Sequence, residues 1–237
     1  MGEWGMESVT FKTVPETLDR EAAVQQEISG TSHTYDISIS GISQKRIYFF
    51  FKRTFDIVFS VFMGVLLMIP MLVIAALIRL DSPGSALFRQ ERLGKDGKPF
   101  IILKFRSMRL DAEENGPQWA EKNDGRCTRI GRVLRKTRLD ELPQLWNILK
   151  GEMSLVGPRP ERACFYDKFE TYIHGFRSRL AVKPGLTGLA QVNGGYDLKP
   201  EEKIIFDTEY IAHCSAGMDL KCIMKTVKLV FTHKGAR

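Results

Sequence analysis

Asp140 and Glu141 are adjacent carboxylates whose type and position could support catalysis. They lie in residues 137–144, where Pro143 is best tolerated within the first turn of a helix. We therefore expect a helix to begin between Thr137 and Asp140, which have the spacing of a capping pair. The N-terminus of a helix favours anions, including phosphate. The pair thus predicts either a simple helix cap or an acidic site beside a bound phosphate.

Two further segments could hold an anion. Arg159 lies between Pro158 and Pro160, which restrict the backbone, so its guanidinium loses little freedom on binding. The same three residues could also form only a rigid turn with an exposed arginine. Residues 183–195 contain repeated glycines whose amides could approach a phosphate, although this pattern also occurs in loops without a ligand.

An uncharged run, residues 57–78, is the most apolar part of the chain. It is long enough to cross the hydrocarbon core of a bilayer, and a buried helix of a soluble domain is the alternative. Pro70 removes a backbone hydrogen bond and should kink the helix. Basic residues flank both ends, whereas the positive-inside rule places them on one side: Lys45, Arg46, Lys52 and Arg53, then Arg79, Arg89, Arg92 and Lys95. We therefore expect a kinked, re-entrant helix that enters and leaves by the same leaflet.

A β-hairpin is predicted after the apolar run, with strands at residues 85–92 and 98–105 and a turn at 94–97. Alternation along the second strand puts Lys104 and Arg106 on one face. Two cations on one strand face indicate either a solvated edge of the sheet or a wall that faces phosphate.

The rest of the chain is predicted to be mainly helical, which makes the fold class α-rich α+β. Residues 161–180 mix aromatic and charged side chains, as in an amphipathic helix on a membrane surface or against a core. The sequence thus predicts a monotopic membrane protein with one kinked re-entrant helix, a small β-hairpin and several amphipathic interfacial helices. The helices are expected at residues 128–150, closed by Gly151, and at 161–180, 200–213 and 218–231.

Charge divides the chain into an acidic arm and a basic body. Residues 1–44 carry seven acidic and two basic side chains without apolar periodicity, so we expect a flexible arm. Residues 45–84 form the predicted membrane element, and residues 85–237 the predicted catalytic domain. Because the whole chain carries +7, the body is strongly basic and should have a polyanionic partner: nucleic acid, anionic lipid or a phosphate-rich substrate. Nucleic acid is disfavoured, since the cations surround an apolar segment and no nucleic-acid motif is found.

The cysteines and histidines do not suggest a metal site. The four histidines are isolated from one another, and no cysteine pair has CxxC spacing. We therefore expect reduced thiols that face a cytosol, at Cys127, Cys164, Cys214 and Cys222.

Several motifs follow one another along the chain in a fixed order. They are Lys52-Arg53-Thr54-Phe55-Asp56, the apolar run with its proline, Lys104-Phe105-Arg106-Ser107-Met108, Leu139-Asp140-Glu141-Leu142, Val156-Gly157-Pro158-Arg159-Pro160, and Lys183-Pro184-Gly185-Leu186-Thr187-Gly188 through Gln191-Val192-Asn193-Gly194. This order resembles the monotopic phosphoglycosyl transferases, the bacterial sugar transferase family that begins glycan assembly on undecaprenyl phosphate. The resemblance runs from about residue 45 to the C-terminus. One departure is Ile69, since family members often have serine before the proline of the apolar run.

The resemblance implies a catalytic dyad of Asp140 and Glu141 on the cytoplasmic leaflet of the bacterial inner membrane. Asp140 would attack the phosphate next to the sugar of a UDP-sugar, forming an aspartyl-phosphosugar and releasing UMP, before polyprenyl phosphate displaces the aspartate. Mg²⁺ would neutralise the phosphates, with Asp140 and Glu141 as its carboxylate ligands, although Glu141 could handle a proton instead. Substrate binding is expected from cationic or polar side chains: Arg159, Lys104, Arg106, Arg138 and Gln191.

The expected partners are a UDP-sugar donor, a polyprenyl phosphate acceptor and membrane lipid, and a homodimer is left open. The C-terminal residues 231–237 resemble relatives that handle glucose or galactose phosphate. Two alternatives stand beside this activity. One is a non-catalytic membrane-surface protein of a polysaccharide-assembly complex, and the other is a phosphodiester hydrolase that uses the same dyad with water.

Overall fold

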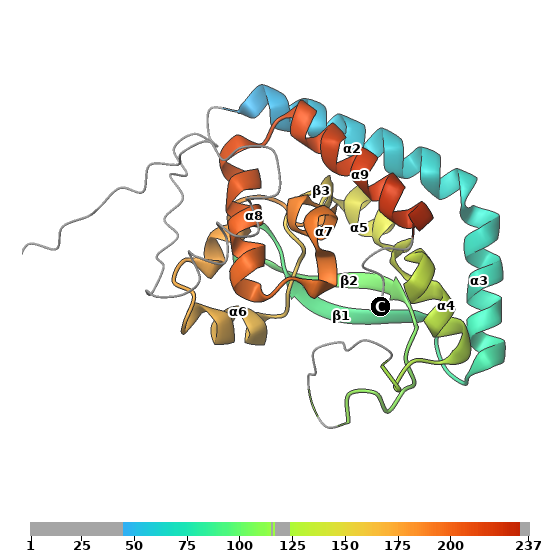
Figure 1. Ribbon diagram of the computed structural model, residues 1–237. Helices are drawn as coiled ribbons and strands as arrows, with labels where there is room; N and C mark the ends of the chain where they lie inside the picture. The colour runs from blue at the N-terminus through green and yellow to red at the C-terminus, as the bar shows by residue number, and fades with distance from the viewer. Residues whose placement is uncertain (1–44, 115, 117–123, 233–237) are drawn as a thin grey trace, which may run out of the picture. The chain divides into compact units, whose positions relative to one another are not determined.

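The computed structural model describes residues 45–114, 116 and 124–232, so the predicted acidic arm lies outside the described residues. The described residues are mainly helical, with two small two-stranded sheets, which confirms the α-rich α+β class. Helices α2 (Arg46–Leu66) and α9 (Ala216–Thr232) run next to each other on one side of α5 (Gln144–Lys150). The hairpin of β1 (Leu87–Leu93) and β2 (Pro99–Phe105) crosses on the other side of α5 (Figure 1).

The apolar run forms two helices, α2 and α3 (Met68–Asp81), which are bent by 62° at Leu67. Pro70 explains the position of the break, because a proline ring clashes with the carbonyl four residues earlier, here Leu66. The predicted kink is confirmed, but the helix breaks before Pro70 rather than at it. Among the residues described, no single helix is long and apolar enough to cross a membrane, whereas the bent pair meets this criterion together.

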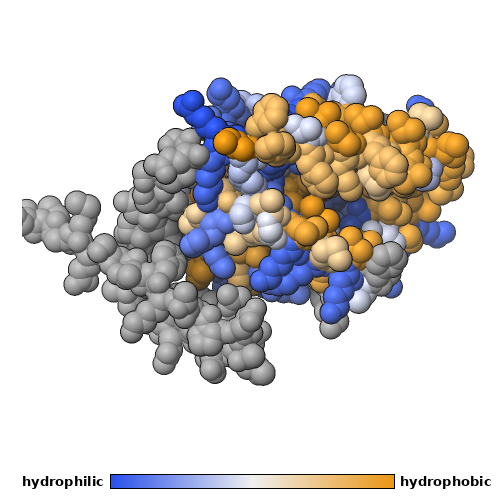
Figure 2. All heavy atoms as spheres, turned by 90° about the horizontal axis from the view of Figure 1, so that it is seen from above, coloured by the Kyte–Doolittle hydropathy of each residue, from blue (hydrophilic) through white to orange (hydrophobic). Residues whose placement is uncertain are grey.

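One face of the bent pair is apolar and exposed (Figure 2). The opposite face packs against the protein, where Tyr48, Phe49, Phe59 and Met63 contact the main core. The exposed apolar residues include Phe50, Phe51, Phe55, Val58, Val61, Phe62, Val65, Leu66, Ile69, Leu72, Val73 and Leu80.

The hairpin matches the prediction closely, with Leu87 opposite Phe105 in an antiparallel register. Its turn contains the 3₁₀ segment η2 (Lys95–Gly97), where Asp96 has φ 58°. The alternative of a solvated edge is wrong, because Arg106 is 5% exposed and binds the end of α3. Its guanidinium donates to the carbonyl of Ser82 at 2.7 Å and to the hydroxyl of Ser82 at 2.8 Å.

The expected helix over residues 128–150 is interrupted. Thr128 caps α4 (Arg129–Thr137) by accepting a hydrogen bond from the Gly131 amide at 2.9 Å, and Gly151 ends α5 with φ 87°. Between them lies η3 (Leu139–Glu141), a 3₁₀ turn that contains both carboxylates. The predicted capping pair is wrong, because Thr137 is the last residue of α4 and donates its hydroxyl back to Val133 O at 2.8 Å.

The glycine-rich segment is not a phosphate-binding loop along its whole length. It contains β4 (Gly185–Thr187), which pairs in parallel with β3 (Ser154–Val156), the short helix α7 (Leu189–Asn193) and the 3₁₀ turn η5 (Gly195–Asp197). A Cβ on Gly185 would lie 2.1 Å from the Gly157 amide nitrogen, and one on Gly188 would lie 2.1 Å from the Gly157 carbonyl oxygen. These glycines therefore let two backbones pack closely, and the Gly185 amide donates to Pro158 O at 2.9 Å.

The long aromatic helix expected at residues 161–180 is wrong. The segment forms α6 (Ala163–Glu170) and the 3₁₀ turn η4 (Phe176–Ala181), separated by a bend. Its aromatic residues belong to a core that includes Ile204 of α8 (Pro200–His213), rather than to an interfacial face. The buried members are Tyr166, Phe169, Ile173, Phe176 and Ile204. Helices α8 and α9 confirm the two predicted C-terminal helices.

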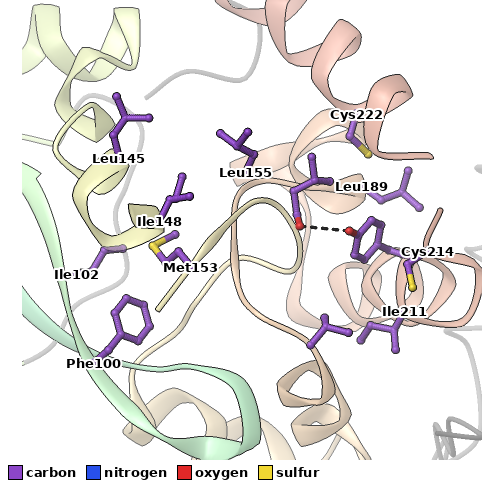
Figure 3. Packing of buried hydrophobic residues seen from close by; sticks show 13 residues of the cluster. Phe100, Ile102, Leu145, Ile148, Met153, Leu155, Leu189, Ile211, Cys214 and Cys222 are labelled. Carbon is purple, nitrogen blue, oxygen red and sulfur yellow. Dashed lines mark hydrogen bonds between the residues drawn. The ribbon is translucent and has the colours of Figure 1, made fainter. Parts of the chain in front are cut away.

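A larger core joins the hairpin, α5, β3 and the last two helices (Figure 3). It includes Ile148, Met153, Ile211 and Cys222, each fully buried. The Tyr210 hydroxyl lies at its edge and donates to Val156 O at 3.2 Å. All four cysteines are free.

Candidate active site

A cavity with a volume of about 490 Å³ lies against the β1–β2 hairpin. All five residues predicted to bind substrate and one of the two predicted catalytic residues line it, although they come from distant segments. They are Lys104, Arg106, Arg138, Asp140, Arg159 and Gln191. The structure therefore brings together six of the seven predicted site residues, and Glu141 lies directly behind them.

The two carboxylates differ in environment. Asp140 lines the cavity, whereas both oxygens of Glu141 are occupied by cations. The Arg159 guanidinium binds Glu141, and Lys104 Nζ lies 3.4 Å from Glu141 Oε1. The residue before the 3₁₀ turn, Arg138, has φ 60°, an uncommon conformation for a residue other than glycine. This left-handed residue ends α4 and redirects the chain so that Asp140 faces the cavity.

These environments shift the two acids in opposite directions. Burial, reinforced by the neighbouring Glu141 charge, raises the pKa of Asp140 to about 6. Burial alone would also raise the pKa of Glu141, but the charges of Arg159 and Lys104 outweigh it and hold that pKa well below its usual range. Glu141 is therefore a fixed anion. Asp140 is the more basic carboxylate of the two, and it remains mostly ionised at neutral pH.

The other predicted residues have distinct settings. The Arg106 guanidinium binds the end of α3, so its role is structural, although part of the side chain borders the cavity. Gln191 is 7% exposed in the cavity wall, and its carboxamide has no hydrogen-bond partner among the described residues. Such a group has its full hydrogen-bonding capacity open to a ligand.

A second charged wall of the cavity was missed by the sequence analysis. Arg179 Nε and Asp207 Oδ2 are 2.7 Å apart, and both side chains are 1% exposed. Arg92 pairs with Glu161 at 3.1 Å, and Lys203 is buried beside them. No spacing rule relates Arg179 to Asp207, which lie 28 positions apart on different elements, so only the fold reveals the pair.

The cavity carries a strong excess of positive charge. Among the described residues, ten basic and four acidic side chains line it. The basic residues come from β1, β2, the segment between β2 and α4, the α4–η3 segment and the turn after β3, as well as from η4 and α8. This arrangement suits a ligand with several negative charges, such as a diphosphate.

The acidic pair is compatible with a magnesium site that is completed by a substrate. Among the residues described, no group of three or more histidine, cysteine or acidic side chains could hold a metal ion alone. Mg²⁺, however, is commonly held by one or two carboxylates together with substrate phosphates. Asp140 offers carboxylate oxygens in the cavity, and Glu141 could contribute only by exchanging a contact with Arg159 or Lys104.

Comparison with known proteins assigns most of the chain to a family. The sequence profile of a family described as "Bacterial sugar transferase" matches residues 47–233. A UDP-N-acetylgalactosamine-undecaprenyl-phosphate N-acetylgalactosaminephosphotransferase of Aeromonas hydrophila is 40% identical over 230 residues, which cover 96% of this chain and 53% of that protein. A putative undecaprenyl-phosphate N-acetylgalactosaminyl 1-phosphate transferase of Bacillus subtilis (strain 168) is 48% identical over 164 residues, which cover 69% and 86%.

Some relatives are considerably longer than this chain. A UDP-glucose:undecaprenyl-phosphate glucose-1-phosphate transferase of Escherichia coli (strain K12) is 40% identical over 207 residues, which cover 85% of this chain and 44% of that protein. The chain thus spans about half the length of the Aeromonas and Escherichia relatives.

Proposed function

Because the chain belongs to the bacterial sugar transferase family, we propose that it transfers a sugar 1-phosphate from a UDP-sugar to polyprenyl phosphate. The observation that carries the proposal is the cavity in which Asp140 faces a cluster of cations. Relatives named for this transfer act on different sugars, namely N-acetylgalactosamine, glucose and galactose, so the names do not select one sugar.

Asp140 acts as the nucleophile in this proposal. One of its carboxylate oxygens bonds to the phosphorus next to the sugar, while the bond from that phosphorus to UMP breaks. An oxygen of polyprenyl phosphate then attacks the same phosphorus, and the bond to Asp140 breaks. The products are UMP and a polyprenyl diphosphate sugar, and Asp140 regains its carboxylate.

The cations of the cavity offset negative charge during this reaction, and the second carboxylate, Glu141, positions two of them. Two anions repel, so the arginines and lysine of the cavity must offset the charge of the donor diphosphate. Bound Mg²⁺ would supply further neutralisation of the phosphates, and Asp140 and Glu141 are the residues that would hold it. Glu141 also fixes Arg159 and Lys104 in place, which keeps their charge near Asp140.

The proposed reaction is tested by UMP release from a panel of UDP-sugars, with and without polyprenyl phosphate. The panel contains UDP-glucose, UDP-galactose, their N-acetylated forms and a bacillosamine-type donor. A transferase should release UMP over many turnovers only when lipid acceptor is present, and at most one UMP per protein molecule without it. Sustained release of UMP in water alone would support a hydrolase, and no release from any donor would support a non-catalytic protein.

We further propose that the protein is monotopic and lies on the cytoplasmic face of the bacterial cytoplasmic membrane. The exposed apolar face of α2 and α3 supports this arrangement, together with the bend between them and the cations at both ends. Helices α4, α5 and α9 also expose large apolar side chains that could contact lipid. They are Val133, Trp146, Leu220, Met224, Val227 and Val230.

Pro70→Leu should shift this topology. The change restores a backbone N–H and removes the ring clash that ends α2, which favours a straight helix long enough to cross. Single cysteines at positions 44 and 82, in a variant without native cysteines, should be shielded from an impermeant thiol reagent added outside intact cells. In the Pro70→Leu protein, position 44 should become labelled in a fraction of molecules.

The control for this experiment is the protein that retains Pro70. Both positions should become labelled once these cells are permeabilised, which shows that the reagent can reach them. Labelling of position 44 but not 82 in intact cells would show a spanning helix and contradict the re-entrant arrangement.

Deletion of residues 1–43 should leave the rate of UMP release within a few-fold of the full chain. All of the predicted site residues lie at or after Lys104, and the family match begins at residue 47. Circular dichroism would establish that the truncated protein is folded. A folded protein that lost most of its activity would place the arm in the site or in a partner contact.

A further inference from the structure

A second, smaller cavity of about 180 Å³ lies beside the first turns of α2 and is separate from the candidate active site. Of the residues that the structure describes, four cationic side chains from three segments and one acidic side chain line it. The cations are Lys52, Arg53, Lys95 and Lys183, and the acid is Asp56.

Two of these cations already have partners in the protein. Arg53 donates to the carbonyls of Ile148 and Leu149, at 2.5 Å and 2.7 Å, and so closes the C-terminal end of α5. Lys52 pairs with Asp219 at 2.7 Å. These two residues have a structural role whether or not a ligand is present.

The other two cations are not neutralised in this way. Within the described part of the chain, the side-chain ammonium groups of Lys95 and Lys183 make no hydrogen bond and no ion pair. Asp56 makes no ion pair with either lysine, although its charge acts on Lys183; it is 2% exposed, and its Oδ1 accepts a hydrogen bond from the Leu155 amide at 3.0 Å.

Lys183 is held among like charges. A Cβ added to Gly151 would lie 3.4 Å from Lys183 Nζ and 3.3 Å from an Arg53 guanidinium nitrogen, so the two cationic groups are near neighbours. Burial, followed by the charges of Arg53 and Lys95, lowers the pKa of Lys183, and the opposing charge of Asp56 does not offset this. Gathering cations in a partly buried hollow is unfavourable unless an anion enters.

We infer that this second cavity binds a phosphate group, held by Lys183 and Lys95 beside Arg53. Its volume exceeds that of a single water, which takes up about 30 Å³ in the liquid, so a tetrahedral oxyanion can enter. The exposed Phe50 and Phe51 lie on the same part of α2. The phosphate can therefore come from a lipid headgroup or from free phosphate, and only the lipid source depends on the proposed membrane association.

Thermal unfolding of the full chain in neutral detergent tests the site without measuring activity. The probes are inorganic phosphate at constant ionic strength, dihexanoyl phosphatidylglycerol and dihexanoyl phosphatidylcholine. Each stabilises the protein according to its affinity for the folded state. Lys183→Met should weaken the apparent affinity for the anionic probe by about fivefold, as expected for the loss of one lysine contact near a phosphate.

Lys98→Met is the matched control, because Lys98 is exposed on the same hairpin turn but does not line the cavity. It removes the same charge and should leave the affinity within experimental error. Without a probe, Lys183→Met should unfold at a temperature no lower than that of the unchanged protein, since it relieves like-charge repulsion. Lys95→Met tests the same cavity at an exposed position where packing is not disturbed.

The probes distinguish the source of the phosphate. Stabilisation by phosphatidylglycerol alone would assign the site to a lipid headgroup, and equal stabilisation by inorganic phosphate would assign it to a free anion. If Lys183→Met and Lys95→Met respond to every probe as Lys98→Met does, the site does not exist. These measurements need no sugar donor. A negative result here is therefore distinguishable from a failure of the proposed transferase activity.

Discussion

Asp140→Asn should lower the rate of UMP release by about 10³-fold or more, the scale seen when a covalent nucleophile is removed. An amide oxygen is not a competent nucleophile toward phosphorus, and the substitution keeps the size of the side chain. The measurement is UMP release with the preferred donor in saturating polyprenyl phosphate. With a donor labelled at the phosphate next to the sugar, and without acceptor, the unchanged protein should become labelled and the variant should not.

The unfolding temperature of the Asp140→Asn protein shows whether a loss of activity comes from misfolding. Asp140 is buried next to Glu141, which raises its pKa, so removal of its charge should leave the unfolding temperature equal or higher. Asp111→Asn removes an exposed carboxylate outside the cavity and should change the rate by less than about twofold. If Asp140→Asn kept more than about a tenth of the rate, the lost barrier would be only ~1.4 kcal/mol and covalent catalysis by Asp140 would be excluded.

Arg179→Met should have the largest effect on stability. It removes the ion-pair partner of Asp207, and both side chains are 1% exposed, so the buried carboxylate keeps only the weaker effect of the Lys203 charge. Breaking a buried ion pair in this way typically costs about 3–5 kcal/mol. For a chain of this size, the unfolding temperature should fall by roughly 10 °C in a thermal scan.

Additional variants separate charge from packing at this position. The Arg179 guanidinium also lies 4.7 Å from the centre of the Phe176 ring and donates to Arg159 O at 3.0 Å. The double variant Arg179→Met with Asp207→Leu removes both charges and should recover most of the lost stability. Arg177→Met affects only an exposed pair and should stay within about 0.5 kcal/mol of the unchanged protein. An Arg179→Met protein with an unchanged unfolding temperature would contradict the argument.

Elements specified by local patterns were predictable from the sequence. The hairpin follows from alternation and a glycine-bounded turn, and α8 follows from Pro200 at its first position. Thr128 and Gly151 mark the limits of the α4–α5 region because caps act within one turn. The same local reasoning located the acidic pair and the arginine between two prolines, which the fold then brought together.

The failures come from interactions that local patterns do not encode. The left-handed Arg138 divides a helical pattern in two, and no residue preference at that position signals it. The aromatic residues of 161–180 have a helical spacing, but burial against α8 decides their structure. Likewise, the partners of Arg106 and Arg179 are distant in sequence, so their roles follow only from the assembled fold.

Strand β2 and the residue after it connect the candidate active site to the end of α3. Lys104 contacts Glu141 of the acidic pair, while Arg106, two residues later on the same face, binds the end of α3 at Ser82. Two residues of extended chain span about 7 Å, a distance that loop motion does not alter. The strand therefore holds the end of α3 at a fixed distance from Glu141, the neighbour of the reacting Asp140. In the proposed membrane arrangement, this fixed distance sets how far from the bilayer the acidic pair lies. The phosphate of the lipid acceptor must reach that height to react.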